Sequence, residues 1–213
     1  MNVLLNGCSF MDNYFYKQHF NKLLNANTVN IARAGSSNRR IIRTTVEHIE
    51  RNPVDLVVIG LTFYDRQESP LVSRADPWVS YNSQGMQAQF ASADDFASTV
   101  EHKIVDDYVK SRYKFDINQH YRDQLYLDLR MFASYLRENS IKFCIFNTCD
   151  THLHENLGEG FVPFTFIGNI FLEQQGSQCM EQDKDLPTNA RHHYGEDVII
   201  LVQHLLGFIN DKV

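Results

Sequence analysis

The segment 54–60, VDLVVIG, constrains the fold more than any other, because it is a β-branched apolar run closed by glycine. A run of this kind is typical of a strand that is buried on both faces of a parallel sheet. Three further short strands are predicted at 2–6, 28–31 and 141–146. Apolar residues at helical spacing fill much of the chain between these runs, so strands and helices alternate. That alternation predicts a parallel sheet with helices on both of its faces.

Capping and helix-breaking residues mark the ends of the predicted helices, and one long segment interrupts the alternation of strands and helices. Asp12 is a plausible N-cap for the first helix, and Asn52-Pro53 ends the second. Residues 62–100 contain prolines and a long polar stretch, too long for a plain connector, so we interpret them as an insertion over the sheet. The chain has no internal repeat or linker, which favours one domain over 1–213. The predicted helices cover 12–24, 38–51, 101–113, 118–138 and 195–213, with a possible short helix near 168–175.

Composition narrows the classes of partner and compartment. The 213 residues contain 20 Lys and Arg against 26 Asp and Glu, a net charge of −6, so no general basic field attracts nucleic acid or an anionic membrane. No apolar run approaches the ~20 residues that span a bilayer, and the N-terminus lacks the basic region of a signal peptide. We therefore expect a cytoplasmic protein without membrane or nucleic-acid partners. A local basic cluster is interpreted as a solvated helix face; it consists of Arg33, Arg39, Arg40 and Arg43.

The cysteines and histidines do not indicate a metal site or a disulfide framework. Four cysteines are present without a C-x-x-C pair, and Cys8 and Cys144 fall in or beside predicted buried strands. Reduced thiols are therefore expected. Asp150, His152 and His154 follow the fourth strand, yet no further ligands stand at a fixed spacing, so we predict neither a metal nor a cofactor.

Ligands of parallel α/β sheets bind beyond the carboxyl ends of the strands, so the residues that follow each strand are the candidates for function. Ser9 follows the first strand on a short turn, where it could act as a nucleophile or simply cap the next helix. Gly35 and Asn38 follow the second strand; glycine lets a backbone N–H face a ligand closely, and Asn38 offers either a side-chain donor or an N-cap. Thr62 follows the third strand.

Aromatic residues gather in and near the predicted insertion. They could line an acyl or sugar pocket, but a small satellite core that anchors the insertion is the favoured interpretation. Asp65 and Arg66 follow the third strand and are expected to pair with each other or to cap its end. The aromatic residues are Phe63, Tyr64, Trp78, Tyr81 and Phe90.

Four stretches resemble the conserved blocks of the SGNH hydrolases, the flavodoxin-like relatives of the GDSL esterases. GCSF (7–10) is similar to the first block and places Ser9 at the nucleophile position. NIARAGSSNRRI (30–41) is similar to the second and places Gly35 at a backbone oxyanion donor. DLVVIGLTFYDR (55–66) is similar to the third block, and HHYGEDVIILVQHLL (192–206) is similar to the fifth. The resemblance implies a flavodoxin-like three-layer α/β/α fold with a central parallel sheet.

The sequence departs from the family pattern at two places. Thr62 stands where the third block has an oxyanion asparagine, so Thr62 itself or Asn38 would supply the missing donor. The family's aspartate three residues before the catalytic histidine is absent. Asn189 holds that place relative to His192, whereas the alignment of the last helix favours His193 as the base, and we favour His193. An asparagine can still orient the imidazole through its carbonyl oxygen.

The resemblance implies a serine hydrolase that cleaves a carboxylic ester, such as an O-acyl group on a carbohydrate or on another small molecule. Ser9 would attack the carbonyl, His193 would take its proton, and the oxyanion would be held by Ser9, Gly35 and either Asn38 or Thr62. The alternative is an SGNH-fold binding or structural module without catalysis, because a fold does not fix a function.

Overall fold

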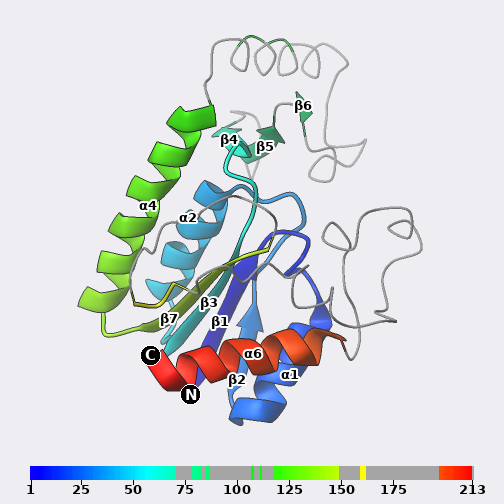
Figure 1. Cartoon of the computed structure of the whole chain (residues 1–213), viewed down its shortest axis with the longest axis vertical. Helices are drawn as coiled ribbons and strands as arrows, with labels where there is room; N and C mark the ends of the chain where they lie inside the picture. Colours follow the sequence, from blue (N-terminus) through cyan, green and yellow to red (C-terminus); the bar gives the residue numbers. More distant parts are fainter. Residues whose placement is uncertain are drawn as a thin grey trace.

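The computed structural model describes residues 1–70, 78–82, 85–86, 107, 111, 118–148, 159–161 and 197–212. Its centre is a sheet of four parallel strands in the order β2-β1-β3-β7 (Figure 1). This order corresponds to the first four strands of flavodoxin-like sheets. The strands are β1 (Asn2–Gly7), β2 (Asn27–Asn30), β3 (Leu56–Leu61) and β7 (Lys142–Asn147).

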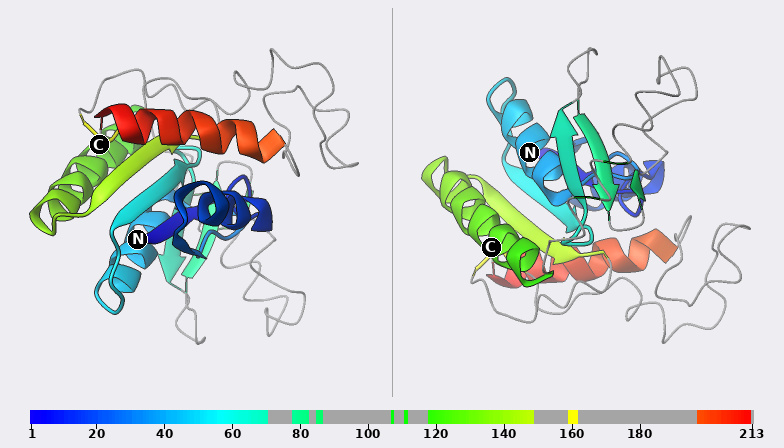
Figure 2. Two further views of the ribbon diagram at one scale, coloured as in Figure 1. Left: turned by 90° about the horizontal axis from the view of Figure 1, so that it is seen from below. Right: turned by 90° about the horizontal axis from the view of Figure 1, so that it is seen from above.

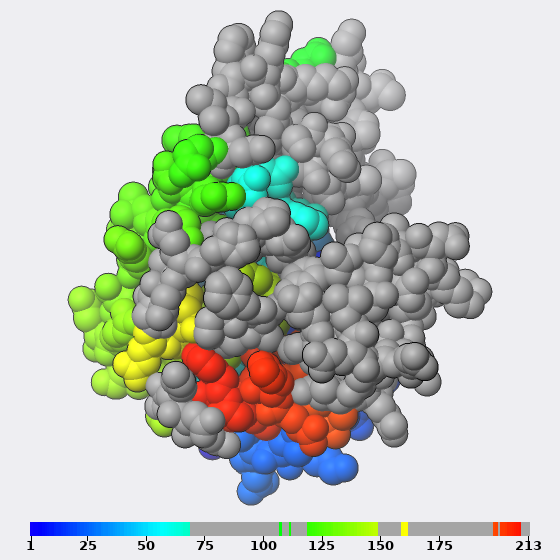
Figure 3. Space-filling model, in the orientation of Figure 1, coloured from blue at the N-terminus to red at the C-terminus, as the bar shows by residue number. Residues whose placement is uncertain are grey.

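Among the helices that the structure describes, two cover each face of the parallel sheet (Figure 2). Alternate strand residues feed the two cores: Val3 and Leu5 pack beneath α1 and α6, whereas Leu4 packs beneath α2 and α4. Helices α1 and α6 lie next to each other in the space-filling view (Figure 3). The predicted three-layer α/β/α fold is therefore confirmed. The helices are α1 (Tyr14–Leu24), α2 (Asn38–Ile49), α4 (Asn118–Glu138) and α6 (Asp197–Lys212).

A second, smaller sheet lies within the segment predicted to be an insertion. It has three antiparallel strands, and Figure 1 places it beyond the carboxyl ends of the parallel strands. Most of the predicted helix 101–113 and all of the possible helix 168–175 lie outside the described residues. The strands of the small sheet are β4 (Gln67–Pro70), β5 (Trp78–Asn82) and β6 (Gly85–Met86).

The N-caps of the first two helices differ from the predicted ones by one residue, for reasons of hydrogen bonding. Asn13, not Asp12, is the N-cap of α1, since its side-chain oxygen accepts from the N–H of Phe15 at 2.9 Å. Ser37 is the N-cap of α2 and accepts from the N–H of Arg40 at 3.1 Å. Neither Ser9 nor Asn38 therefore serves as a helix cap.

The basic cluster is not a uniformly solvated face. Arg40 is 9% exposed and so is buried, Arg39 pairs with Asp128 on α4 at 3.0 Å, and Arg43 pairs with Glu47 at 3.1 Å. The cluster was interpreted as solvated because sequence spacing does not show which of its members face a neighbouring helix. Part of its charge instead connects α2 to α4.

Buried thiols are present at both described cysteine positions. Cys8 and Cys144 are free and buried, as predicted. Cys149 and Cys179 lie outside the described residues. Among the helices that the structure describes, none combines the length and apolar character needed to cross a membrane.

Candidate functional site

The candidate site lies at the carboxyl edge of the parallel sheet, where the crossovers diverge. From β1 the chain passes through α1 to β2 on one face, and from β2 it passes through α2 to β3 on the other. Strand β1 thus has neighbours on both sides that are reached by opposite routes. Such a switch point is where open α/β sheets bind ligands. Ser9, Gly35 and Thr62 stand in the segments that follow these three strands.

Ser9 is half-buried in a short turn between β1 and α1. The carbonyl oxygen of Cys8 closes this turn by accepting from the N–H of Met11 at 2.9 Å and of Asp12 at 3.0 Å. Since α1 begins only at Tyr14, the Ser9 turn is a separate element between strand and helix.

The turn is anchored by Met11, whose side chain is fully buried against two glycines. Gly7 and Gly60 are register partners in β1 and β3. A Cβ at Gly7 would lie 2.5 Å from Met11 Cγ, and one at Gly60 would lie 2.6 Å from the same atom. These distances are too short for real contacts. The two glycines therefore provide the space that Met11 occupies.

Two side chains tie the turn to the loop that follows β2. Asn30 donates through Nδ2 to the carbonyl of Met11 at 2.8 Å and accepts through Oδ1 from the N–H of Ala32 at 3.0 Å. Asp12 accepts from the N–H of Ala34 at 3.0 Å. The segment that carries Ser9 and the segment that carries Gly35 are thus held together by side-chain hydrogen bonds.

Gly35 is buried and has a φ of 74°, a left-handed conformation that glycine adopts without strain. On its C-terminal side, the N–H and hydroxyl of Ser36 both donate to the carbonyl of Arg33, at 3.1 and 2.7 Å. Within the part of the chain that the structure describes, the Gly35 N–H has no hydrogen-bond partner. It stands three residues before the first residue of α2, whose N-terminal end favours negative charge.

Asn38 and Thr62 are joined by two hydrogen bonds. The Oδ1 atom of Asn38 accepts from the N–H of Thr62 at 2.8 Å, and Nδ2 donates to the Thr62 carbonyl at 3.0 Å and to that of Phe63 at 3.4 Å. The Thr62 N–H is therefore already bonded. The Thr62 hydroxyl is different: it is buried and has no partner among the described residues. Of the two residues considered for the missing oxyanion donor, Thr62 has the uncommitted side chain.

A buried polar network that sequence reasoning missed lies directly beneath this edge. Asn6 is 1% exposed, and its Nδ2 atom lies 2.9 Å from each of three acceptors on α2: the Ile41 carbonyl and the hydroxyls of Thr44 and Thr45. Its Oδ1 atom accepts from the N–H of Gly7 at 2.8 Å. The network fixes α2 against the end of β1. The sequence does carry a signal for this network: Asn6 is a polar residue at the end of an otherwise apolar strand, directly before Gly7.

A second polar contact joins the turn to β7. The Sγ atom of Cys8 lies 3.5 Å from the hydroxyl of Thr148, which donates to the carbonyl of Leu61 at 2.6 Å. Burial, with a smaller contribution from Cys8, raises the pKa of Tyr16 far above its usual range, so that phenol stays protonated. Cys8 is wholly buried, which assigns it a packing role beside Ser9.

The remaining predicted residues cannot be placed in this geometry. His192, His193 and Asn189 lie outside the described residues, as do Asp150, His152 and His154. The described residues contain no group of three or more His, Cys, Asp or Glu side chains that could hold a metal ion. Of the predicted site residues, the structure places Ser9, Gly35 and Thr62 in the segments that follow three neighbouring strands.

Comparisons with known proteins add no family to this picture. No protein-family model matches the chain, and a comparison with curated proteins gives no match.

Proposed function

We propose that this protein is a serine hydrolase of the SGNH type, which cleaves a carboxylic ester such as an O-acyl group on a carbohydrate. The observation that carries the proposal is the Gly35 N–H, which lacks a described partner in a buried left-handed turn tied to the Ser9 turn. A backbone donor left open beside a serine at a switch point suits the stabilisation of a developing oxyanion.

The chemistry begins at Ser9. Its hydroxyl attacks the ester carbonyl, and His193 accepts the hydroxyl proton, since serine is a poor nucleophile unless a base removes that proton. The carbonyl oxygen becomes negative and accepts from the N–H groups of Ser9 and Gly35, with the Thr62 hydroxyl as the third donor. His193 then gives the proton to the departing alcohol, and water hydrolyses the acyl-enzyme by the same steps.

Asn38 has a different role in this proposal from the one first considered. Both polar atoms of its amide bond to the backbone at 62–63, so it positions Thr62 instead of contacting the oxyanion. Asn189 remains the candidate to orient the histidine through its carbonyl oxygen. The free buried thiols Cys8 and Cys144 suit a cytoplasmic location, because that compartment keeps thiols reduced.

Labelling with a fluorophosphonate tests the nucleophile directly. We expect mass spectrometry to find the label on the peptide that contains Ser9, with no label in Ser9→Ala. Ser134→Ala is the matched control, because Ser134 is exposed on α4 and belongs to none of the segments proposed to form the site. Labelling of Ser9→Ala at the wild-type level, or no labelling under conditions that modify a control hydrolase, would count against the proposal.

Hydrolysis of short-chain esters identifies the base. His193→Ala is expected to lower kcat to about the level of Ser9→Ala, because removing either member of such a pair disables the same step. His192→Ala is expected to retain most of the wild-type rate. The reverse result would transfer the role of base to His192 and leave the serine mechanism in place.

A binding module without catalysis is the second candidate. It is favoured by one observation: Thr62 replaces the family's oxyanion asparagine, while the nearest asparagine side chain, Asn38, is bonded to the backbone. Equal ester hydrolysis by wild type and Ser9→Ala, together with ligand binding that survives in both, is the result that favours this module.

A further inference from the structure

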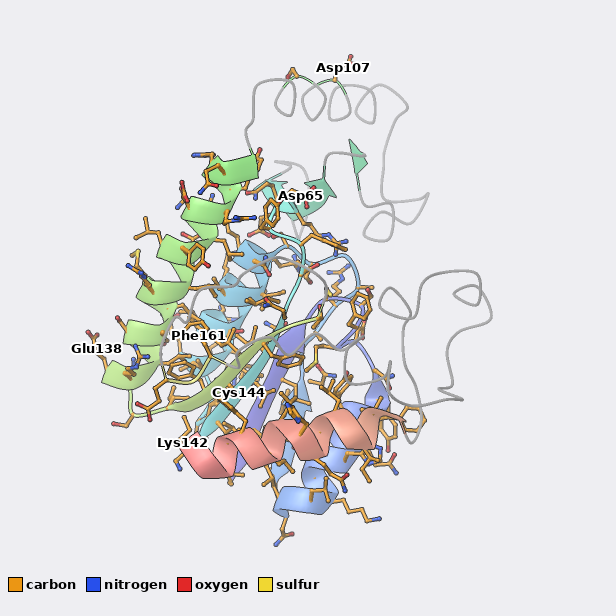
Figure 4. The ribbon with its side chains drawn as sticks, viewed as in Figure 1. Asp65, Asp107, Glu138, Lys142, Cys144 and Phe161 are labelled. Carbon is orange, nitrogen blue, oxygen red and sulfur yellow. The ribbon has the colours of Figure 1, made fainter. Side chains whose placement is uncertain are left out.

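Two arginines flank the loop that follows β3, one strand away from the Ser9 turn. Arg66 closes that loop, and its Cζ atom lies 5.6 Å from the centre of the Phe63 ring. Arg122 lies in the second turn of α4, with its Cζ atom 5.6 Å from the centre of the Tyr64 ring. Figure 4 shows Asp65, the residue before Arg66, at the carboxyl edge near the first turns of α4.

In the part of the chain that the structure describes, no carboxylate pairs with either of these arginines. Within the described part of the chain, the guanidinium groups of Arg66 and Arg122 form no ion pair and no hydrogen bond. Asp65 has contacts of its own but no ion pair with Arg66. In contrast, Arg39 and Arg43 on α2 pair with Asp128 and Glu47. Two uncompensated cations at one sheet edge stand out in a chain of net charge −6.

The Nε and Nη atoms of the two guanidinium groups differ in burial. Among the described residues, the buried atoms without a hydrogen-bond partner include the Nε atom of each arginine but neither of its terminal Nη atoms. The contact of each guanidinium group with an aromatic ring further restricts where that group lies. Buried donors without partners cost free energy, and their retention calls for a functional reason. Each arginine is therefore half-buried, with terminal Nη groups that remain available to a ligand.

We propose that Arg66 and Arg122 bind an anionic group of the ligand, a carboxylate or a phosphate. The two Nη groups of a guanidinium match two oxygens of such an anion, which is why arginine recognises these groups in preference to lysine. In terms of substrate class, the ester that reaches Ser9 carries a negative charge away from its scissile bond. This second half of the proposal rests on the hydrolase function proposed above, whereas anion binding by itself does not.

Titration with inorganic phosphate tests anion binding without any chemistry. At constant ionic strength, calorimetry is expected to show that Arg66→Gln and Arg122→Gln each weaken phosphate binding by about tenfold or more, the effect of losing one charged hydrogen-bonding partner. Arg51→Gln is the matched control, since Arg51 is exposed in the connection between α2 and β3, at the opposite edge of the sheet. Phosphate binding that is absent in wild type, or equal in all four proteins, would overturn the site.

A matched pair of esters tests the substrate class. The 4-nitrophenyl monoester of succinate carries a carboxylate where 4-nitrophenyl butyrate carries a methyl group. Wild type is expected to prefer the succinate ester in kcat/KM, and each arginine variant is expected to reduce the ratio of the two kcat/KM values by about tenfold. An unchanged preference in both variants would refute the assigned substrate class.

The two tests separate the failure of this inference from the failure of the hydrolase function. If neither ester is hydrolysed but phosphate binding depends on Arg66 and Arg122, the anion site stands and the hydrolase proposal fails. If Ser9-dependent hydrolysis is present but indifferent to both arginines, the hydrolase proposal stands and the anion site fails.

Discussion

The side chain of Asn38 holds the backbone of Thr62 from both sides, with Oδ1 accepting from its N–H at 2.8 Å and Nδ2 donating to its carbonyl at 3.0 Å. Both residues are buried, at 3% and 0% exposure. The pair joins the N-terminal end of α2 to the segment that leaves β3. The side-chain amide of Asn38 makes the two backbone hydrogen bonds that a neighbouring strand would otherwise make to Thr62. The chain can therefore leave the sheet at this residue with both of its backbone groups bonded.

Asn38→Ala tests this relationship. The substitution leaves a buried N–H and a buried carbonyl of Thr62 without partners, so we expect the free energy of unfolding to fall by about 1–3 kcal/mol. Urea unfolding measures the change. Asn52→Ala is the control, since Asn52 is exposed and makes a single hydrogen bond to His48. A loss no larger than that of Asn52→Ala would show that water replaces the amide at little cost.

Thr62→Val separates stability from catalysis. The Thr62 hydroxyl has no partner among the described residues, so valine, which has the same shape, should leave the free energy of unfolding unchanged or slightly raised. If the hydroxyl is the third oxyanion donor, kcat should fall by about 10²–10³-fold. Thr62→Ser keeps the hydroxyl and should retain activity. Ester hydrolysis at the wild-type rate in Thr62→Val would remove Thr62 from the oxyanion site.

Gly60→Ala tests the space beneath Met11. The added methyl group would overlap the side chains of Met11 and Thr148, both of which are buried, so we expect a loss of about 1–3 kcal/mol in the free energy of unfolding. Gly207→Ala on α6 is the control with the opposite sign. Its Cβ would meet nothing within 4 Å, and alanine in a helix is favoured over glycine by about 0.5–1 kcal/mol. Thermal or urea unfolding of both variants measures the contrast.

Alkaline pH should weaken the fold through Cys144. Burial raises the pKa of this thiol far above its usual range. The unfolded chain loses the proton near the ordinary pKa of about 8.5, whereas the folded chain keeps it, so the stability it contributes is present below that pH and declines above it. We expect the free energy of unfolding to decrease from about pH 8 to pH 10, and to decrease less steeply in Cys144→Ala.

Urea unfolding at several pH values gives both slopes. Modification of the thiol by a maleimide in the native protein supplies an independent check, because the peptide that contains Cys144 should react only after denaturation. Identical pH slopes in wild type and Cys144→Ala would show that other groups cause the alkaline decline.

The architecture could be predicted because three of the four parallel strands, β1, β3 and β7, are buried along most of their length and therefore read as apolar runs, whereas β2 is partly exposed. The predicted strand 54–60 begins two residues before β3 (Leu56–Leu61), since the apolar Val54 extends the run although it does not join the ladder. The positions of Ser9, Gly35 and Thr62 at one edge followed from topology alone. Parallel strands leave the same edge by necessity.

Hydrogen-bond partners could not be predicted in the same way. Asp12, Asn13, Ser37 and Asn38 are all good capping residues, and only the tertiary structure decides which of them caps. Asp12 bonds to the loop after β2 and Asn38 to the end of β3, because those backbone groups come within reach only after the sheet has formed. The buried role of Asn6 was missed for the same reason.

The seating of Met11 over Gly7 and Gly60 also sets where this architecture can diversify. An inserted residue between Gly7 and Met11 would lift the side chain from the space the two glycines leave for it, and β1 is bonded on both sides. Insertions and deletions are therefore expected to be tolerated poorly within 7–13. Changes in ligand preference are then expected in the loop that follows β3, whereas the Ser9 turn is expected to keep its length.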